Sequence, residues 1–294
     1  MSGAIPSDVD WLDSGELHRY LVVDVFTSRP LEGNQLGVFL DGRPFDAEQM
    51  QSLARELKFA ETVFLLPPRE GGDVRIRIFT PISELPFAGH PVLGTAFVAG
   101  RAFGAETVTL ETGAGRVPIE LERDGGRITF GRMQQPIPTW EPFAREAELL
   151  AALGVESSLL PVELYRNGPV HAYVRLPSDG AVAALVPNVA ALTELSVAAN
   201  CFAGSGRRWK TRMFYPAAGV PEDAATGSAA GPLAVHLARH GEIAFGEQIE
   251  ISQGSEIGRP SVLYATATGE RDRIDSVEVG GVAVVVAEGR YRAG

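Results

Sequence analysis

The sequence predicts an α+β fold with a mostly antiparallel sheet, built as two similar halves. Predicted strands outnumber helices and do not alternate with them regularly, which disfavours a parallel βαβ sheet. A chain of 294 residues is long enough for two domains at roughly 150 residues each. Residues 77–81 (RIFTP) recur as residues 212–216 (RMFYP), and each copy precedes an acidic loop and a glycine-rich entry into a small-residue helix.

Hydrophobic patterning and turn signals place the elements of the first half. Residues 20–26 are β-branched and apolar and stop before Pro30, as expected of a buried strand. Asp46 is a suitable N-cap for the next helix, with Gln49 three residues later. The predicted strands are 20–26, 36–40, 62–66, 74–79, 107–111, 117–121 and 127–130, and the predicted helices are 46–57 and 90–100.

The second half follows the same style of pattern. Gly154 and Gly241 mark the ends of two helices. The predicted strands are 172–176, 197–202, 210–214, 248–252, 261–266, 275–279 and 282–287, and the predicted helices are 145–153, 189–195 and 228–239. We divide the chain into an N-terminal half, residues 1–130, which the C-terminal strand could complete, and a C-terminal half, residues 131–294.

Charge and cysteine content exclude several classes of protein. A net charge of −11 disfavours nonspecific binding to nucleic acid or to an anionic membrane. Cys201 is the only cysteine, so no intrachain disulfide can form. Residues 1–10 lack the pattern of a signal peptide, and the apolar run 279–287 is too short to span a bilayer. We therefore expect a cytoplasmic protein with no nucleic-acid or membrane partner.

The two glycine-rich helix entries are the candidate ligand-binding elements. A helix N-terminus presents unpaired N–H groups and a partial positive charge, and Gly89 and Gly227 would let a ligand approach the backbone. Two such ends facing each other could hold a small anion, most simply a carboxylate. Neither loop carries the lysine of a phosphate-binding loop, which disfavours a nucleotide. For either glycine alone, helix packing is a better explanation than ligand binding. The presence of two matching glycine-rich helix entries favours ligand binding.

Four polar residues near these entries have two interpretations. Asp223 and Ser228 could simply cap their helix, and His90 could be a loop hydrogen-bonding residue. Alternatively, the three converge at one cleft as groups that exchange or orient protons. Glu61 stands in a locally apolar stretch where a carboxyl group could serve in acid–base chemistry, although the pattern alone favours a surface glutamate at a strand start.

Other groups of residues in the sequence give weaker indications of a functional site. His236 and His240 have the i, i+4 spacing of a zinc motif but lack its glutamate, and His240 beside Gly241 is better interpreted as a helix C-terminal cation. Cys201 lies in an apolar strand and is expected to be buried and inert. The basic run 207–212 is either a solvated face or a guide for an acidic substrate.

Longer motifs resemble those of a known family. Residues 31–38 (LEGNQLGV), 61–64 (ETVF), 84–95 (ELPFAGHPVLGT) and 219–232 (GVPEDAATGSAAGP) are similar to the PhzF family, whose members share the diaminopimelate epimerase fold. The resemblance runs nearly end to end. Stretches typical of the phenazine-biosynthesis members are also present at residues 135–140, 200–204, 206–209 and 256–260.

The resemblance implies an enzyme and a mechanism. It implies two pseudo-symmetric domains, each a mostly antiparallel barrel-like sheet around a central helix, with the active site in the cleft between them. It implies a homodimer without metal or organic cofactor. The implied reaction is the isomerisation of trans-2,3-dihydro-3-hydroxyanthranilate, which moves a proton from C3 to C1 and transposes a C=C bond to give a reactive aminoketone. The family's catalytic proton shuttle falls on Glu61, its substrate-binding polar groups on His90, Asp223 and Ser228, and its site glycines on Gly89 and Gly227.

Two further functions keep the fold but change the chemistry. One is a racemase or epimerase for another amino-acid-like acid. A two-thiol epimerase is excluded, because Cys201 is the only cysteine and lies outside both loops. The other is a non-catalytic protein that binds small acids. Joint retention of Glu61, His90, Asp223 and Ser228 argues against it, since a scaffold requires none of them.

Overall fold

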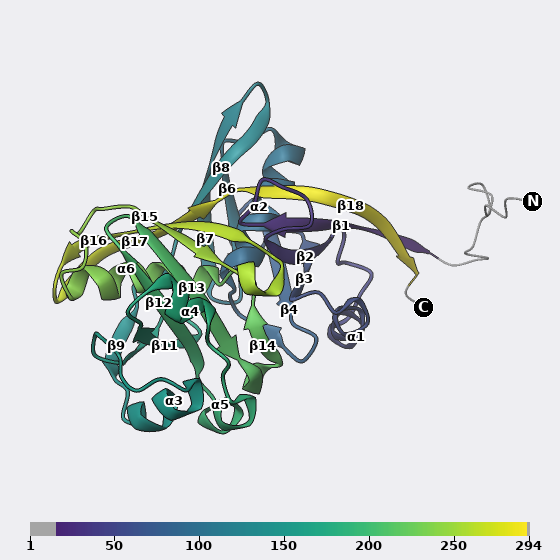
Figure 1. Ribbon diagram of the computed structural model, residues 1–294. Helices are drawn as coiled ribbons and strands as arrows, with labels where there is room; N and C mark the ends of the chain where they lie inside the picture. The colour runs from purple at the N-terminus through teal and green to yellow at the C-terminus, as the bar shows by residue number, and fades with distance from the viewer. Residues whose placement is uncertain (1–15, 293–294) are drawn as a thin grey trace, which may run out of the picture.

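The computed structural model describes residues 16–292 as one continuous network of strands around two buried helices (Figure 1). Residues 1–10, considered above for a signal peptide, lie outside the described residues. No helix within the described part of the chain is long and apolar enough to cross a membrane.

The N-terminal half is a sheet in the spatial order β18–β1–β2–β3–β4–β6–β7–β8. Only the β2–β3 and β4–β6 neighbours are parallel. The bounds are β1 (Leu17–Val25), β2 (Asn34–Phe39), β3 (Glu61–Leu66), β4 (Val74–Phe79), β6 (Thr107–Thr112), β7 (Gly115–Asp124), β8 (Arg127–Gln134) and β18 (Ala283–Arg292). Helix α2 (Gly89–Phe103) packs against this sheet, and β5 (Glu84–Leu85) leads into it.

The C-terminal half repeats this order as β9–β10–β11–β12–β13–β15–β16–β17. Its parallel neighbours, β11–β12 and β13–β15, fall at the matching positions. The bounds are β9 (Thr139–Pro142), β10 (Glu163–Arg166), β11 (Val170–Arg175), β12 (Ala198–Ser205), β13 (Arg208–Tyr215), β15 (Ile249–Gln253), β16 (Ser261–Glu270) and β17 (Arg273–Gly281). Helix α6 (Gly227–Arg239) follows β14 (Val220–Asp223), as α2 follows β5.

The repeat extends to individual side chains. Arg77 on β4 forms a two-point ion pair with Glu84, with N···O distances of 2.7 and 2.6 Å. Arg212 on β13 pairs with Glu222 in the same way, at 2.8 and 2.7 Å. Each guanidinium also lies about 5 Å from the ring of the phenylalanine two residues later. The RIFTP and RMFYP motifs therefore occupy equivalent positions in the two halves.

The two sheets are barrel-like but open. Strand β8 pairs with β17 of the other half, and within residues 16–292 no ladder joins β8 to β18. Figure 1 shows β18, in yellow, running along β1, in purple, so the end of the chain completes the sheet of the first half. Residue 130, where we divided the chain, lies inside β8, and the division itself stays a prediction.

Local sequence explains the helices. Asp46 caps α1 (Ala47–Leu57) and forms the expected capping box with Gln49. Helix α2 is small and apolar because sheet surrounds it, and it is buried from Gly89 to Gly100. Gly154 ends α3 in the left-handed conformation, with φ of 71°. The helices of the second half are α3 (Glu146–Leu153), α4 (Asp179–Ala183), α5 (Val189–Leu195) and α6.

One hydrophobic core connects the halves. It contains residues of both α2 and α6 together with strands of both sheets. A second cluster fills the space under α3, α4 and α5, and a third packs α1 against aromatic residues of β2, β3 and β4. The prediction missed β9 and β10, and prolines at 136, 138 and 142 obscure the strand signal at β9.

Candidate functional site

The N-termini of α2 and α6 meet where the two halves join. A Cβ atom placed on Gly89 would lie 2.8 Å from the carbonyl carbon of Gly227 and from the amide nitrogen of Ser228. A Cβ atom on Gly227 would lie 3.2 Å from the backbone of Gly89. Only glycines permit this approach, so both glycines are required by the contact between the two helix ends.

These two helix ends have no side-chain caps. Of the described helices, α1, α4 and α5 begin with the capping side chains of Asp46, Ser178 and Asn188. In contrast, α2 and α6 have no side-chain cap bond and no acidic residue in the first turn. No side-chain oxygen therefore competes for their first N–H groups, although the N–H of Ala229 in α6 donates to the Thr226 carbonyl. This leaves a positively polarised surface suited to a carboxylate.

Side chains from neighbouring strands fix the first turn of α6. Pro232 has no N–H, so the carbonyl of Ser228 four residues earlier cannot receive the usual helical bond. Asn167 Nδ2 donates to that carbonyl at 2.9 Å. The adjacent carbonyls of the turn receive Gln135 Nε2 at 2.8 Å and the Tyr173 hydroxyl at 2.7 Å. The position of this helix end is therefore set by three separate anchors.

Glu61 and His90 form a pair beside these helix ends. Glu61 is the first residue of β3, and its Oε2 lies 3.0 Å from Nε2 of His90, the second residue of α2. The side chains are 15% and 6% exposed. The plainer interpretation of Glu61 as a surface residue is therefore wrong, because the parallel β2–β3 pairing directs the start of β3 toward α2.

Asn34 joins this pair to Asp223. Its Nδ2 donates to Asp223 Oδ1 at 2.8 Å and to the carbonyl of Ala225 at 2.9 Å, and lies 3.3 Å from His90 Nδ1. The other oxygen of Asp223 accepts from the Thr226 hydroxyl at 2.6 Å. Neither Asp223 nor Ser228 caps α6, so the simple capping interpretation of these two residues is also wrong.

The charges of the site are coupled. Burial opposes the charged form of His90, but the facing carboxylates of Glu61 and Asp223 outweigh it and raise the pKa of His90 above its ordinary 6.5. Burial, reinforced by the Glu61 carboxylate, also raises the pKa of Asp223. The two facing carboxyl groups therefore favour the charged form of this imidazole more than solvent would.

Ser228 faces a second histidine. Its Oγ lies 3.1 Å from Nε2 of His171, a residue of β11 that is 2% exposed. Here burial acts without a facing carboxylate and lowers the pKa of His171 to about 4. The surroundings therefore shift the pKa values of these two histidines in opposite directions, up for His90 and down for His171.

The polar residues break the symmetry between the halves. Thr62 pairs with Phe79 and Ala199 with Phe214, so the residue equivalent to Glu61 is Ala198. In the same way Leu85, paired with Ile78, corresponds to Asp223, paired with Met213. The fold supplies two equivalent positions, and only one of each pair carries a carboxylate.

The structure thus brings together all six residues selected from the sequence, Glu61, Gly89, His90, Asp223, Gly227 and Ser228. The sequence patterns do not single out Asn34, His171, Gln135 or Asn167, which the structure also places at the site. Arg259 holds the loop before Asn34 by donating to Asp24 at 2.6 Å and to the Gly33 carbonyl at 2.8 Å. The signal available for Asn34 was its place within the LEGN motif.

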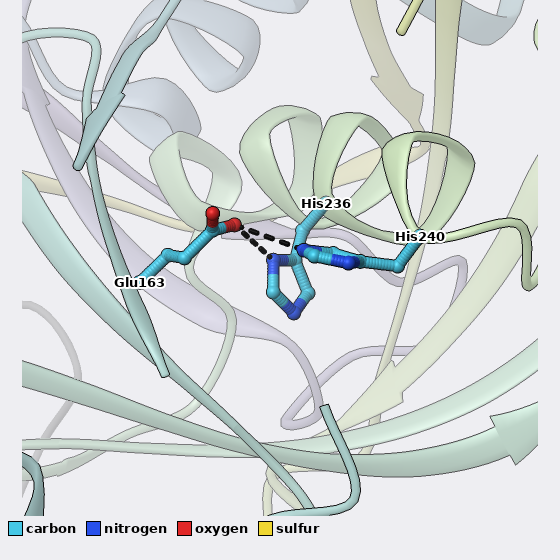
Figure 2. A group of neighbouring side chains, drawn as sticks. All are labelled: Glu163, His236 and His240. Carbon is cyan, nitrogen blue, oxygen red and sulfur yellow. Dashed lines mark hydrogen bonds and ion pairs between the residues drawn. The ribbon is translucent and has the colours of Figure 1, made fainter. Parts of the chain in front are cut away.

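A separate polar cluster lies near the C-terminal end of α6 (Figure 2). Glu163 Oε2 is 3.2 Å from His236 Nδ1 and 3.0 Å from His240 Nε2, so a carboxylate from β10 joins the two histidines. Arg239 Nη1 lies 2.8 Å from the same oxygen. Because a guanidinium already neutralises this carboxylate, a divalent cation would be repelled there. His240, at the last turn, pairs with Glu163 as well as with the helix end.

Cys201 is fully buried, and burial raises the pKa of its thiol to about 12. A thiolate at neutral pH is therefore disfavoured, and the expectation of an inert cysteine is confirmed.

Two open barrel-like halves whose central helices meet end to end define a fold that solved structures of other proteins share. A protein from Agrobacterium radiobacter described as a probable proline racemase has the same fold, with a TM-score of 0.65 at 16% identity, covering 94% of this chain and 93% of that one. The family model for phenazine biosynthesis-like protein, PhzC-PhzF, matches residues 23–289. The chain belongs to this family, which confirms the resemblance found in its motifs.

Individual relatives agree with this assignment. The trans-2,3-dihydro-3-hydroxyanthranilate isomerase of Pseudomonas aeruginosa is 56% identical over 275 residues, covering 93% of this chain and 99% of the relative. A PhzF-family phenazine biosynthesis protein from Bacillus anthracis has a TM-score of 0.82 at 26% identity, covering 95% of this chain and 100% of that one.

Proposed function

We propose that this protein is an isomerase that converts trans-2,3-dihydro-3-hydroxyanthranilate to an aminoketone in phenazine biosynthesis, with Glu61 carrying a proton from C3 to C1. The single observation that carries the assignment of Glu61 is its position, 3.0 Å from His90 and beside two uncapped helix ends. The identity to the Pseudomonas isomerase supports the substrate.

The substrate carboxylate binds at the helix ends. The N–H groups of the first turns of α2 and α6, at Gly89 and Gly227, point toward an anion without competition from capping side chains. The Ser228 hydroxyl adds a side-chain donor at the same place. Binding the carboxylate there fixes the ring relative to Glu61.

Proton transfer then requires one base. Glu61 accepts the proton of C3, and the C–H bonding electrons form a C3=C4 double bond. The two conjugated double bonds of the dihydro ring shift in turn, C4=C5 becoming C5=C6 and the electrons of C6=C1 passing to C1. Glu61 returns the proton to C1, so the step is redox-neutral. The resulting enol tautomerises to the aminoketone. His90 and Asp223 bind and orient the polar substituents, and general acid–base help of this kind is worth roughly 10²–10⁴-fold in rate.

The broken symmetry favours this mechanism over a two-base racemisation. A racemase needs an acid and a base on opposite faces of one carbon, and the position equivalent to Glu61 holds Ala198, which cannot exchange a proton. One carboxyl group can instead remove and return a proton on the same ring face.

The test is the variant Glu61→Gln, which keeps the shape and removes the base. We expect turnover to fall by at least about 10³-fold while substrate still binds, as measured by single-turnover kinetics and by calorimetry. Glu70→Gln, an exposed residue outside the site, is the control and should behave like wild type. In deuterated water, the protonated Glu61 carboxyl group can exchange its proton with solvent before returning it. The wild-type reaction should then leave deuterium at C1. Normal turnover by Glu61→Gln would overturn the shuttle, and no isomerisation by wild type would overturn the function.

We also propose that the protein is a homodimer located in the cytoplasm and that it works without metal or organic cofactor. The family resemblance supports the first point, and the net charge of −11 is compatible with a freely dissolved protein. Sedimentation equilibrium at micromolar concentration should give twice the 31.3 kDa mass of the chain, and a monomer mass would contradict the dimer.

A further inference from the structure

His171 lies behind Ser228 at a position where the fold does not require a polar side chain. Leu36 pairs with Glu61 between β2 and β3, and His171 pairs with Ala198 between β11 and β12, so Leu36 and His171 are equivalent. Leu36 is 0% and His171 2% exposed. A buried leucine satisfies this position in one half, so the imidazole in the other half needs a separate reason.

The hydrogen bonds of His171 select one tautomer. Asn200 Nδ2 lies 3.2 Å from His171 Nδ1, and also 3.2 Å from the carbonyl of Ala198 and 3.4 Å from that of Ala172. Two carbonyl oxygens fix the Asn200 amide with its nitrogen toward them, because the reverse orientation would oppose oxygen to oxygen. The nitrogen of an amide only donates, so His171 Nδ1 accepts and the ring proton resides on Nε2.

The ring proton on Nε2 points at Ser228. Nε2 lies 3.1 Å from Ser228 Oγ, so the imidazole donates and the hydroxyl accepts. Burial keeps the ring neutral by lowering the pKa of His171 to about 4, which preserves this single-proton state. A hydroxyl has one proton, and that proton is then available for an acceptor other than His171.

On the basis of the proposed function, we propose that His171 is a positioning residue that makes Ser228 a hydrogen-bond donor to the substrate carboxylate. A carboxylate only accepts hydrogen bonds, so a serine whose proton was directed to a histidine would face the anion with its lone pairs. With Nε2–H occupying one lone pair of Oγ, the hydroxyl proton points to the anion between the helix ends. His171 thus acts through Ser228 without contacting substrate.

The test is a double-mutant cycle between His171→Leu and Ser228→Ala, with His171→Gln as the conservative variant. Leucine fits the equivalent position in the other half, and Asn200 keeps its two carbonyl partners, so His171→Leu should fold. We expect His171→Leu to raise KM by about 10- to 100-fold with a smaller change in kcat, since one charge-assisted hydrogen bond is lost. His171→Gln, which restores an N–H donor, should recover most of this loss.

The cycle decides between coupling and a merely structural role. In the Ser228→Ala background, His171→Leu should change KM by less than about 2-fold, because the partner through which it acts is gone. Fully additive effects, or a wild-type KM in His171→Leu, would overturn the inference. If Ser228→Ala itself binds substrate normally, the assignment of Ser228 to the site fails first, which separates that failure from failure of the His171 inference.

A measurement on the unmutated protein provides an independent check. Long-range ¹H–¹⁵N correlation spectra of the histidine rings distinguish a protonated from an unprotonated ring nitrogen. We expect His171 to carry its proton on Nε2 and to stay neutral down to about pH 5, while His90 titrates at a higher pH than His171. A proton on Nδ1 of His171, or a cationic His171 at neutral pH, would overturn the inference whether or not any variant folds.

Discussion

The contact between Gly89 and Gly227 allows a sharp test of the site, because Gly89→Ala perturbs it with a single methyl group. The added Cβ would lie 2.8 Å from the Gly227 carbonyl carbon and the Ser228 amide nitrogen, and 2.9 Å from the Gly227 Cα. All three are backbone atoms on a helix end held by side-chain anchors, so they cannot rotate away. The two helix ends must therefore separate.

The size of the effect follows from that distance. Ordinary van der Waals contact begins at 3.4 Å, so relief from 2.8 Å requires a displacement of about 0.6 Å or more. A misplacement on the order of 1 Å costs up to about 10²-fold in rate when it separates groups that bind and react with one substrate. Overpacking of this kind typically costs about 1–3 kcal/mol of stability. We expect kcat/KM to fall about 10- to 100-fold in a protein that remains folded.

The assay is steady-state isomerisation of dihydro-hydroxyanthranilate, followed by loss of substrate, together with thermal unfolding of the same samples. Gly180→Ala is the matched control, since a Cβ there meets only Ser178 Oγ at 3.7 Å and lies in helix α4. It should leave kcat/KM unchanged and stability equal or slightly higher. A Gly89→Ala protein that folds and retains kcat/KM within about 2-fold of wild type would refute the claim that the helix ends bind substrate.

The remaining predictions concern charged groups and metal. Glu163→Gln should lower the free energy of unfolding by about 3 kcal/mol, because it leaves Arg239 and two histidines without their carboxylate. Urea denaturation at pH 7 measures this change. Wild-type stability of the variant would contradict the charge-paired role of Glu163. Burial opposes the charge of Glu163, but hydrogen bonds from His236, His240, Tyr165 and Arg239 hold its pKa below the ordinary 4.5. The difference between wild type and variant should therefore be full above that pH and shrink as the pH falls below it; a difference that grows toward acid would have the wrong sign. Because the pKa of His90 is raised above 6.5, its charge and its pairing with Glu61 are present at lower pH and are lost as the pH rises through the raised value. The pH profile of kcat/KM should accordingly decline on the alkaline side, and a flat profile between about pH 6 and 9 would argue against a cationic His90. Treatment with EDTA should leave activity unchanged, and inactivation reversed by a divalent metal would count against metal-free catalysis.

Much of the fold is encoded locally. The capping box of Asp46 and Gln49, the glycine stop at Gly154 and the β-branched run at residues 20–26 each act within a few residues, so their elements lie close to where the pattern predicts. The repeated Arg-X-Phe-X-Pro motif is also contiguous, which is why the two-half organisation was visible in the sequence. Strands β9 and β10 were missed because they are held mainly by pairing to each other and to β11.

The residues of the candidate site likewise differ in whether local sequence is enough to predict them. Glycines at the helix entries, with His90 and Ser228 beside them, could be selected because each pair is adjacent in sequence. Asn34, Glu61 and His171 come from three strands, and only the parallel register of β2 with β3 and of β11 with β12 turns them toward the helix ends. The sequence therefore identified the ends of the helices better than the residues that converge on them.

The sequence by itself determined that two small-residue helices enter from glycine-rich loops in two similar halves, because turn and helix signals depend on near neighbours. Only the tertiary structure decided the pKa shifts of the two buried histidines at the site, His90 and His171. The carboxylates of Glu61 and Asp223 face His90 and raise its pKa, whereas His171 faces an amide and a hydroxyl and burial lowers its pKa. Burial is common to both, and the charge of an imidazole is set by the groups that the fold places against it.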